Sequence, residues 1–244
     1  MNLVIDIGNT AAKLALFEGD DLVGEVMRTD NHSLSGLSAL VASHPTIRRA
    51  ILSTVVRLSD NTLEIIDNLP FPVLKLQPST PLPIPASFHF PTTMGSDRIA
   101  DDVAAIIGAA GHPALVIDAG TCLTAELLHP EHGFMGGIIS PGVRLRLLAM
   151  HKHTDALPLV SRTATNDELL GHDTEGNMLL GATNGVTFEI EGYIRRLTAK
   201  YHDLVVFITG GYTFSLDNSI KSPIIQDKLL LLRGLNHILN FNEA

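Results

Sequence analysis

The apolar positions of the chain fall into short runs, and two of these runs have nearly the same sequence. Residues 3–8 are Leu-Val-Ile-Asp-Ile-Gly, and residues 115–120 are Leu-Val-Ile-Asp-Ala-Gly. In both copies an uninterrupted apolar run ends in an aspartate, one further residue and a glycine. Continuous apolar runs are typical of strands that are buried on both faces. The repeat therefore predicts two homologous halves, each built on a buried strand that ends in an Asp-x-Gly turn.

Each copy is followed by two further strand-like runs with a turn between them, which predicts a strand meander in each half. We expect an α/β protein that divides into residues 1–113 and 114–244. Strands are predicted at 2–7, 12–18, 21–28, 50–56, 123–128, 134–139 and 204–208 and from Ala114 onward; helices are predicted at 33–43, 61–68, 143–151, 173–199 and 233–239 and from Ser96 onward.

The chemistry of the repeated turn indicates a site for a metal–nucleotide complex. An aspartate at the end of a buried strand is expected where the strand emerges, because a buried unpaired carboxylate is very costly. The glycine lets the backbone turn tightly and approach a ligand, and exposed N–H groups in such a turn attract an anion. A carboxylate beside a phosphate requires a cation between them. The alternative is a plain β-hairpin with a capping aspartate, but two copies in matched context favour the site.

Residues 70–98 combine a proline-rich stretch with the start of a helix. Seven of the thirteen prolines fall within residues 70–91, which excludes a helix or a central strand there. This stretch is either a stiff loop or a preformed pocket wall. Ser96 is a suitable N-cap for the helix that follows. Asp97 lies roughly opposite the apolar stripe of that helix, so it either compensates the helix dipole or faces a ligand.

Composition and charge narrow the class of protein. Of the residues, 45% are hydrophobic and 18% are charged, which allows a sizeable core, and the net charge is −9. This charge argues against nucleic acid or an anionic membrane as a partner. The only cysteine, Cys122, forms no intrachain disulfide and is expected to fill space rather than to act as a nucleophile. With no signal peptide and no membrane-spanning run, we expect a cytoplasmic protein.

Two glycine patterns lie in the second half. Glycines recur along the predicted helix 173–199, and such small residues allow close approach of another helix, either within the fold or across a dimer. The strand at 204–208 is followed by Thr209-Gly210-Gly211, a turn that can lie flat against an adenosine. The chain has neither a P-loop nor a Rossmann fingerprint.

Together these motifs resemble the duplicated RNase H-like architecture of the acetate/sugar kinase, Hsp70 and actin superfamily, and within it the type III pantothenate kinases. The resemblance covers essentially the whole chain. The family motifs Asp-x-Gly-Asn-Thr/Ser, Gly-x-Asp-Arg and Asp-x-Gly-Thr match residues 6–10, 95–98 and 118–121. Gly136-Gly137 through Pro141-Gly142 also fits the expected order. Each motif alone is a weak signal, whereas their order and spacing together are specific.

The resemblance implies ATP-dependent phosphorylation of pantothenate, the first step of coenzyme A biosynthesis, by a homodimer. It implies Asp97 as the catalytic residue that takes the proton of the pantothenate hydroxyl. It also implies Mg²⁺ at Asp6, directly or through water, and a monovalent cation, K⁺ or NH₄⁺, at Asp118. The other implied contacts are Phe88, Gly95, Ser96, Arg98 and Thr174 for pantothenate, and Asp6, Ile7, Gly8, Asn9, Thr10, Lys13, Thr121 and Gly210 for ATP.

The chain departs from the family pattern at three places. Phe88 stands where the family commonly has a tyrosine, so a hydroxyl contact is lost. Cys122 replaces the usual alanine, and the residues after Thr174 are atypical. Two other functions stay open: a kinase of the same superfamily with another small acceptor, and a catalytically silent ATP-binding regulator. Retention of Asp6, Asp97, Arg98 and Asp118 argues against the silent regulator.

Overall fold

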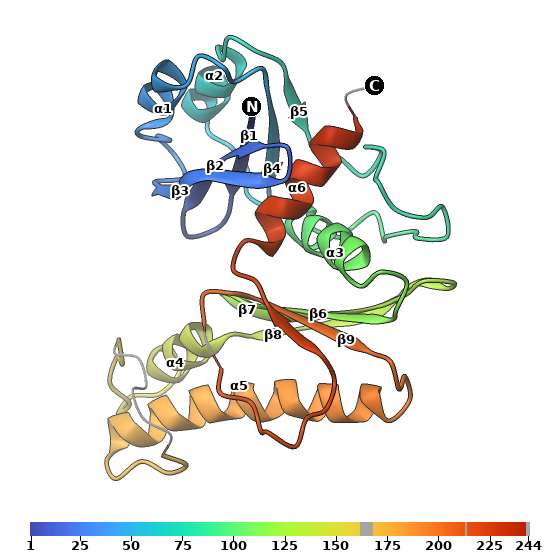
Figure 1. Cartoon of the computed structure of the whole chain (residues 1–244). Coiled ribbons are helices and arrows are strands. Elements are labelled where there is room, and N and C mark those ends of the chain that lie inside the picture. Colours follow the sequence, from blue (N-terminus) through green and yellow to red (C-terminus); the bar gives the residue numbers. More distant parts are fainter. Residues whose placement is uncertain (162–167, 213, 243–244) are drawn as a thin grey trace. The chain divides into compact units, whose positions relative to one another are not determined.

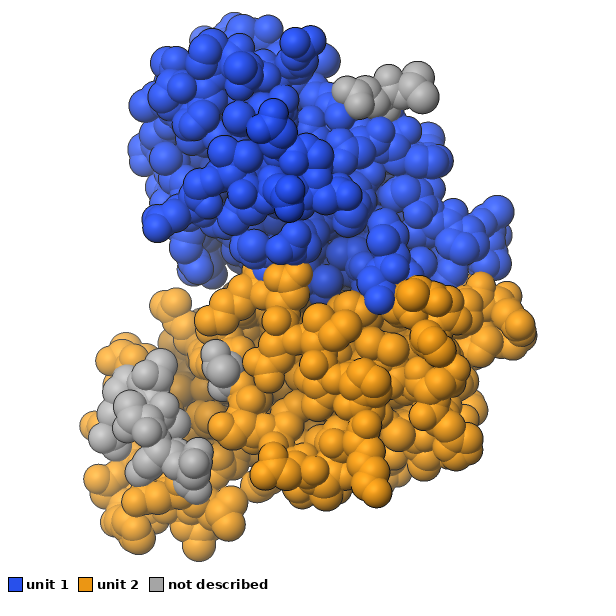
Figure 2. All heavy atoms as spheres, viewed as in Figure 1, with its two compact units in different colours: residues 1–108, 229–244 blue, residues 109–228 orange. Residues whose placement is uncertain are grey.

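The computed structural model describes residues 1–161, 168–212 and 214–242, and it contains two compact units. Unit 1 consists of residues 1–108 and 229–244, and unit 2 consists of residues 109–228 (blue and orange in Figure 2). Each unit is built around its own five-stranded sheet, so each is described separately.

The sheet of unit 1 has the strand order β3-β2-β1-β4-β5. Strands β1, β2 and β3 form an antiparallel meander, whereas β4 and β5 continue the sheet in parallel with β1. Every residue of β1 is buried, as expected for the continuous apolar run at the start of the chain. The strands are β1 (Asn2–Ile7), β2 (Ala12–Glu18), β3 (Asp21–Thr29), β4 (Arg49–Thr54) and β5 (Val73–Lys75).

Helices cover both faces of this sheet (Figure 1). One face packs against α1 (Leu37–Ser43) and α2 (Asp60–Asp67), which bury Leu37 and Ile66 in the core of the unit. The other face is covered by α3 (Ser96–Gly108) and α6 (Leu230–Phe241), which also pack against each other.

Unit 2 repeats the same arrangement, with the strand order β8-β7-β6-β9-β10. The first three strands again form an antiparallel meander, and two parallel strands again extend it from the central strand. This equivalence confirms the prediction of two halves that share a duplicated RNase H-like fold. The strands are β6 (Ala114–Ala119), β7 (Cys122–His129), β8 (Gly133–Pro141), β9 (Val205–Gly210) and β10 (Ile224–Gln226).

The long helix α5 (Thr174–Thr198) runs along one face of this sheet beside α4 (Val143–Lys152), as Figure 1 shows. Its residues Val186, Ile190 and Ile194 recur every four positions and are at most 1% exposed in the core. The predicted helix at 173–199 is therefore confirmed to within one residue at each end.

The position of α6 corrects the expected division into residues 1–113 and 114–244. This helix belongs with unit 1, not with the second half that precedes it in the sequence. Gly234 of α6 lies so close to α3 that a Cβ at this position would overlap the carbonyl oxygen of Ala100. In addition, the buried amide of Asn2 donates hydrogen bonds to Asn236 Oδ1 (2.7 Å) and Asn240 Oδ1 (2.8 Å). The two hydrogen bonds of Asn2 connect segments that are more than 200 residues apart.

Two short strands were not predicted from the sequence. Strand β5 lies inside the proline-rich stretch directly after Pro72, and β10 directly follows Pro223. Both are edge strands, where a neighbouring proline is tolerated because one side of the strand needs no partner. Among the described residues, no helix combines the length and apolar character needed to span a bilayer.

Candidate active site

The first Asp-x-Gly turn lies at the carboxyl end of β1. Asp6 is 6% exposed, and in the strand register it stands opposite Lys13 on β2 and Ser53 on β4. The turn is closed by a hydrogen bond from the Gly8 N–H to the Ala11 carbonyl (3.1 Å), while Asn9 at its tip is exposed. The adjacent Thr10 is exposed as well. The sheet therefore fixes the aspartate and presents the turn to solvent, as a phosphate-binding turn requires.

A residue absent from the predicted site holds this turn in place. The side-chain amide of Asn31 donates to the carbonyl of Gly8 at 3.0 Å and to that of Asn9 at 3.4 Å. The preceding Asp30 accepts the N–H groups of His32 and Ser33, each at 2.9 Å. These backbone hydrogen bonds, led by that of Ser33, hold the pKa of the Asp30 carboxyl below its usual value of 3.8. The Asp30-Asn31 pair after β3 was the only sequence signal for this contact.

The Gly-x-Asp-Arg motif lies beside this turn, at the start of α3. The Ser96 hydroxyl donates to the Thr54 carbonyl (3.1 Å) and also lies 3.0 Å from the Ser53 hydroxyl. The helix begins at Ser96 with a bond from the Ile99 N–H to the Gly95 carbonyl. Gly95, not Ser96, is therefore the capping residue, and the predicted N-cap is wrong. The serine hydroxyl instead attaches α3 to the end of β4.

The carboxylate of Asp97 is turned back over the first turn of α3. Its Oδ1 accepts the N–H of Arg98 at 2.8 Å. A Cβ on residue 95 would overlap the same oxygen, so Gly95 provides the space that this conformation needs. Gly95, Asp97 and Arg98 are all partly exposed. The motif thus presents one acidic and one basic side chain at the carboxyl edge of the unit 1 sheet.

A cavity of about 280 Å³ lies against this motif. Gly95 and Ser96 form part of its wall, together with Val55 from the segment after β4 and Met94. Gln77 and Pro78 of the proline-rich stretch also line it, which supports the interpretation of that stretch as a pocket wall. Phe88 is 8% exposed and is not among the lining residues.

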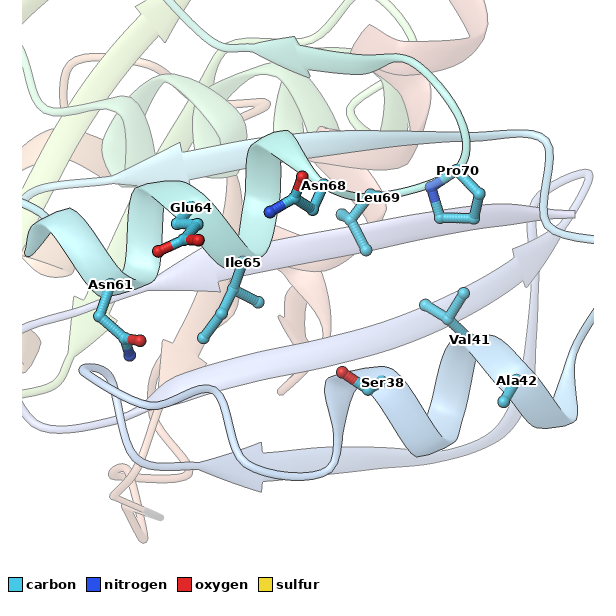
Figure 3. Close-up of a pocket in the computed structure, with 9 residues that line it drawn as sticks. All are labelled: Ser38, Val41, Ala42, Asn61, Glu64, Ile65, Asn68, Leu69 and Pro70. Atoms are coloured by element: carbon cyan, nitrogen blue, oxygen red, sulfur yellow. The ribbon is translucent and has the colours of Figure 1, made fainter.

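A second cavity in unit 1 has a volume of about 550 Å³ and lies between α1 and α2 (Figure 3). It is lined by apolar side chains such as Val41, Ile65 and Leu69, and by polar ones such as Glu64. None of its lining residues belongs to a predicted motif, so the smaller cavity beside Gly95 is the candidate for the acceptor.

The second Asp-x-Gly turn lies at the equivalent edge of unit 2. Asp118 stands near the carboxyl end of β6, and the Gly120 N–H donates to the Cys122 carbonyl at 2.9 Å. The exposed Thr121 forms the tip, and its carbonyl accepts the N–H of Gly142 at 3.1 Å. Because Gly142 directly precedes α4, this bond joins the turn to the start of that helix.

Gly210, at the end of the neighbouring strand β9, lies against the second Asp-x-Gly turn. Its φ of 103° lies in the left-handed region that favours glycine. A Cβ there would lie 2.5 Å from Asp118 Oδ1 and 2.5 Å from the Ala119 carbonyl oxygen. Asp118 and Thr121 of one motif and Gly210 of another are therefore brought together.

Thr174 lies apart from these turns in the sequence, as the first residue of α5. It is exposed and follows Asp173, whose carboxylate caps the helix by accepting the Gly176 N–H at 2.6 Å. The structure thus places Thr174 at a well-formed helix start.

The oxygen atoms at both Asp-x-Gly turns suit hard cations. Asp6 and Asp118 offer carboxylate oxygens, and Thr54, Ala119 and Thr121 bring carbonyl groups to the same sheet edges. Mg²⁺ and K⁺ both prefer oxygen ligands, and Mg²⁺ keeps several waters, so one or two carboxylates with substrate phosphates suffice. Within the described ranges, no group of three or more His, Cys, Asp or Glu side chains forms a metal site by itself.

Comparison with solved structures defines the class. The fold matches a proposed Baf family transcriptional activator from Campylobacter jejuni with a TM-score of 0.58 at 19% identity, covering 98% of each chain. It also matches a proposed N-acetylmannosamine kinase from Listeria monocytogenes with a TM-score of 0.53 at 14% identity, covering 99% of each chain. These likenesses show the fold, the duplicated RNase H-like architecture of actin-like ATPases and sugar kinases.

Comparison with protein families identifies the branch. The chain is 43% identical to a type III pantothenate kinase of Phocaeicola vulgatus and 46% identical to one of Bacteroides fragilis, over all of this chain and 99% of each relative. The family profile described as type III pantothenate kinase matches residues 2–196. The chain therefore belongs to the type III pantothenate kinase family.

Proposed function

We propose that this chain catalyses the ATP-dependent phosphorylation of pantothenate to 4′-phosphopantothenate, the first step of coenzyme A biosynthesis. The observation that carries the proposal is the similarity over the full length to type III pantothenate kinases, combined with the placement of the motifs. Each Asp-x-Gly turn lies at the carboxyl edge of its sheet, where ligands bind in open α/β sheets.

In this proposal both turns contribute contacts to ATP. In unit 1, the N–H groups around Gly8 and the side chains of Asn9, Thr10 and Lys13 contact the phosphates. In unit 2, Thr121 is an ATP contact and Gly210 leaves room for the adenosine. Asp6 would hold Mg²⁺, directly or through water, and Asp118 would hold K⁺ or NH₄⁺. When bound, these cations would supply positive charge beside the phosphates, and positioning and charge neutralisation dominate phosphoryl transfer.

The acceptor is expected beside α3, in the cavity at Gly95. Asp97 orients the primary hydroxyl of pantothenate and accepts its proton late, because a carboxylate is a weak base at neutral pH. Arg98 supplies a cation for the carboxylate of pantothenate. Ser96 forms part of the cavity wall. Its hydroxyl is engaged in hydrogen bonds within the protein and is not free to bind the substrate. Phe88 is retained as a candidate contact through its ring.

A homodimer is proposed from one face of α5. Gly181, Gly185, Phe188 and Gly192 follow one another on this face, and Phe188 is 56% exposed although it is large and apolar. Phe188→Glu should convert a dimer into a monomer in sedimentation analysis, whereas Glu191→Gln should not. If the wild-type chain is a monomer at all concentrations, the dimer and any contribution of Thr174 to a partner's site are excluded.

A coupled ADP-release assay tests the activity. Turnover that depends on pantothenate is the expected result. Turnover only with another small hydroxyl or carboxylate acceptor would identify a different kinase of the superfamily. ATP binding without turnover for any acceptor would identify a silent regulator. The net charge of −9 and the single cysteine support small-molecule partners and a cytoplasmic location.

A further inference from the structure

Ser53 is a buried hydroxyl residue between the two parts of the unit 1 site. It is 0% exposed and stands beside Asp6 in the register of β1 and β4. Its hydroxyl lies 3.0 Å from that of Ser96, the first residue of α3. Ser53 therefore neighbours the aspartate of the phosphate turn on one side and the helix of Asp97 on the other.

The direction of the hydrogen bonds follows from the number of protons. The single hydroxyl proton of Ser96 is donated to the Thr54 carbonyl at 3.1 Å. The bond between the two serine hydroxyls must therefore be donated by Ser53. This chain, from Ser53 to Ser96 to Thr54, fixes the rotamers of both serines inside the protein. Neither hydroxyl proton is left to donate to a substrate.

The backbone that receives this anchor is itself held firmly. The Thr54 side chain accepts the Val56 N–H at 3.2 Å and donates to the Val56 carbonyl at 3.0 Å. The Val55 N–H reaches the Ile7 carbonyl of β1 at 3.4 Å. The start of α3 is therefore tied to the ends of β4 and β1, next to Asp6.

We infer that Ser53 is a positioning residue that, through Ser96, fixes the first turn of α3 and so the carboxylate of Asp97 relative to Asp6. The inference rests on the proposed kinase function. Misplacement of a reacting group by about 1 Å can cost on the order of 10²-fold in rate. A hydroxyl that contacts no substrate can thus influence kcat by holding the helix that carries Asp97.

The test compares Ser53→Ala and Ser96→Ala with a matched control. Ser222→Ala removes a similar hydroxyl pair, in which Ser222 and Thr198 lie 2.6 Å apart. Ser222 lies just before β10, near the amino end of that strand and away from the predicted motifs. We expect Ser53→Ala and Ser96→Ala each to lower kcat about tenfold or more with the KM for ATP nearly unchanged. All three variants should lower the melting temperature by similar amounts, but Ser222→Ala should leave kcat unchanged.

The double variant separates positioning from general destabilisation. Ser96→Ala already removes both bonds of this chain, so Ser53→Ala/Ser96→Ala should lower kcat no further than Ser96→Ala alone. Wild-type kcat in Ser53→Ala, measured well below its melting temperature, would overturn the inference, as would additive losses. If Ser53→Ala fails to fold, Ser96→Ala, which is partly exposed, decides in the same way. If the wild-type chain turns over only another acceptor, the proposed substrate is refuted, and the serine variants are then measured with that acceptor. If the wild-type chain turns over no acceptor, both proposals are refuted.

Discussion

Asp118 and Gly210, on neighbouring strands of unit 2, approach so closely that a Cβ on residue 210 would lie 2.5 Å from Asp118 Oδ1. The same glycine has a φ of 103°, which side chains rarely adopt. The aspartate of the second turn therefore owes its position to the absence of a side chain on the adjacent strand.

Gly210→Ala should impair ATP use. The new methyl group must displace the Asp118 carboxylate or the β9 backbone, and strain of this kind costs on the order of 1–3 kcal/mol. We expect kcat/KM for ATP to fall about tenfold or more, measured by ADP release. Gly111→Ala is the matched control, because Gly111 also has a positive φ, of 91°, and a Cβ there meets nothing within 4 Å. Equal losses in both variants would show that the contact with Asp118 is unimportant.

Asp97→Asn should separate catalysis from helix stability. We expect kcat to fall about 10²-fold or more while ATP binding stays nearly intact, because the amide cannot accept the proton. Asp60→Asn is the control, since Asp60 is likewise an acidic residue in the first turn of its helix, α2. If Asp97 only compensated the helix dipole, both variants would keep their kcat and differ from wild type only slightly in stability.

Asn31→Ala should loosen the first phosphate turn. Loss of the hydrogen bonds to Gly8 and Asn9 removes about 1 kcal/mol of preorganisation, which corresponds to roughly a fivefold increase in the KM for ATP. The KM for pantothenate should stay unchanged. Asn61→Ala provides the comparison, because its amide donates to His32 and not to the turn. An unchanged KM for ATP in Asn31→Ala would mean that the turn keeps its shape without this contact.

The lowered pKa of Asp30 predicts a specific pH dependence of folding stability. Backbone N–H groups, that of Ser33 first, lower the pKa of its carboxyl in the folded state below 3.8. The unfolded state therefore binds the proton more readily, and the stabilisation is complete above the usual pKa and lost as the pH falls through the folded pKa. A carbon NMR titration of Asp30 should give a midpoint below 3.8. A midpoint at or above 3.8 would contradict the hydrogen bonds, and Asp30→Asn should lack this contribution.

Gly234→Ala should destabilise unit 1. The added methyl group would overlap the Ala100 carbonyl oxygen of α3, and overpacking of this kind costs about 1–3 kcal/mol. The melting temperature should fall by several degrees, measured by calorimetry. Gly211→Ala makes the same exchange in open space and should change the melting temperature far less. An unchanged melting temperature in Gly234→Ala would show that α6 can shift away from α3.

The sequence alone determined the strands other than β5 and β10, the long helix and the order of the motifs, because these depend on local patterns. The apolar runs at 3–8 and 115–120 predicted two equivalent sheets, and both sheets have the same strand order. The motifs around Asp6, Asp97 and Asp118 could be assigned because their residue types and spacing match one family. The assignment to the type III pantothenate kinase family is confirmed by full-length similarity.

Only the tertiary structure decided which distant residues meet. Asn31 binds the Gly8 turn, and α6 packs against α3 although about half of the chain lies between the two helices. Ser96 was expected to cap its helix, but it bonds to Ser53 and Thr54 instead. A hydroxyl group bonds whatever partner the folded chain brings within about 3 Å, and local sequence carries no record of that partner. Periodicity thus specified the elements, whereas packing between elements specified the contacts that position the site.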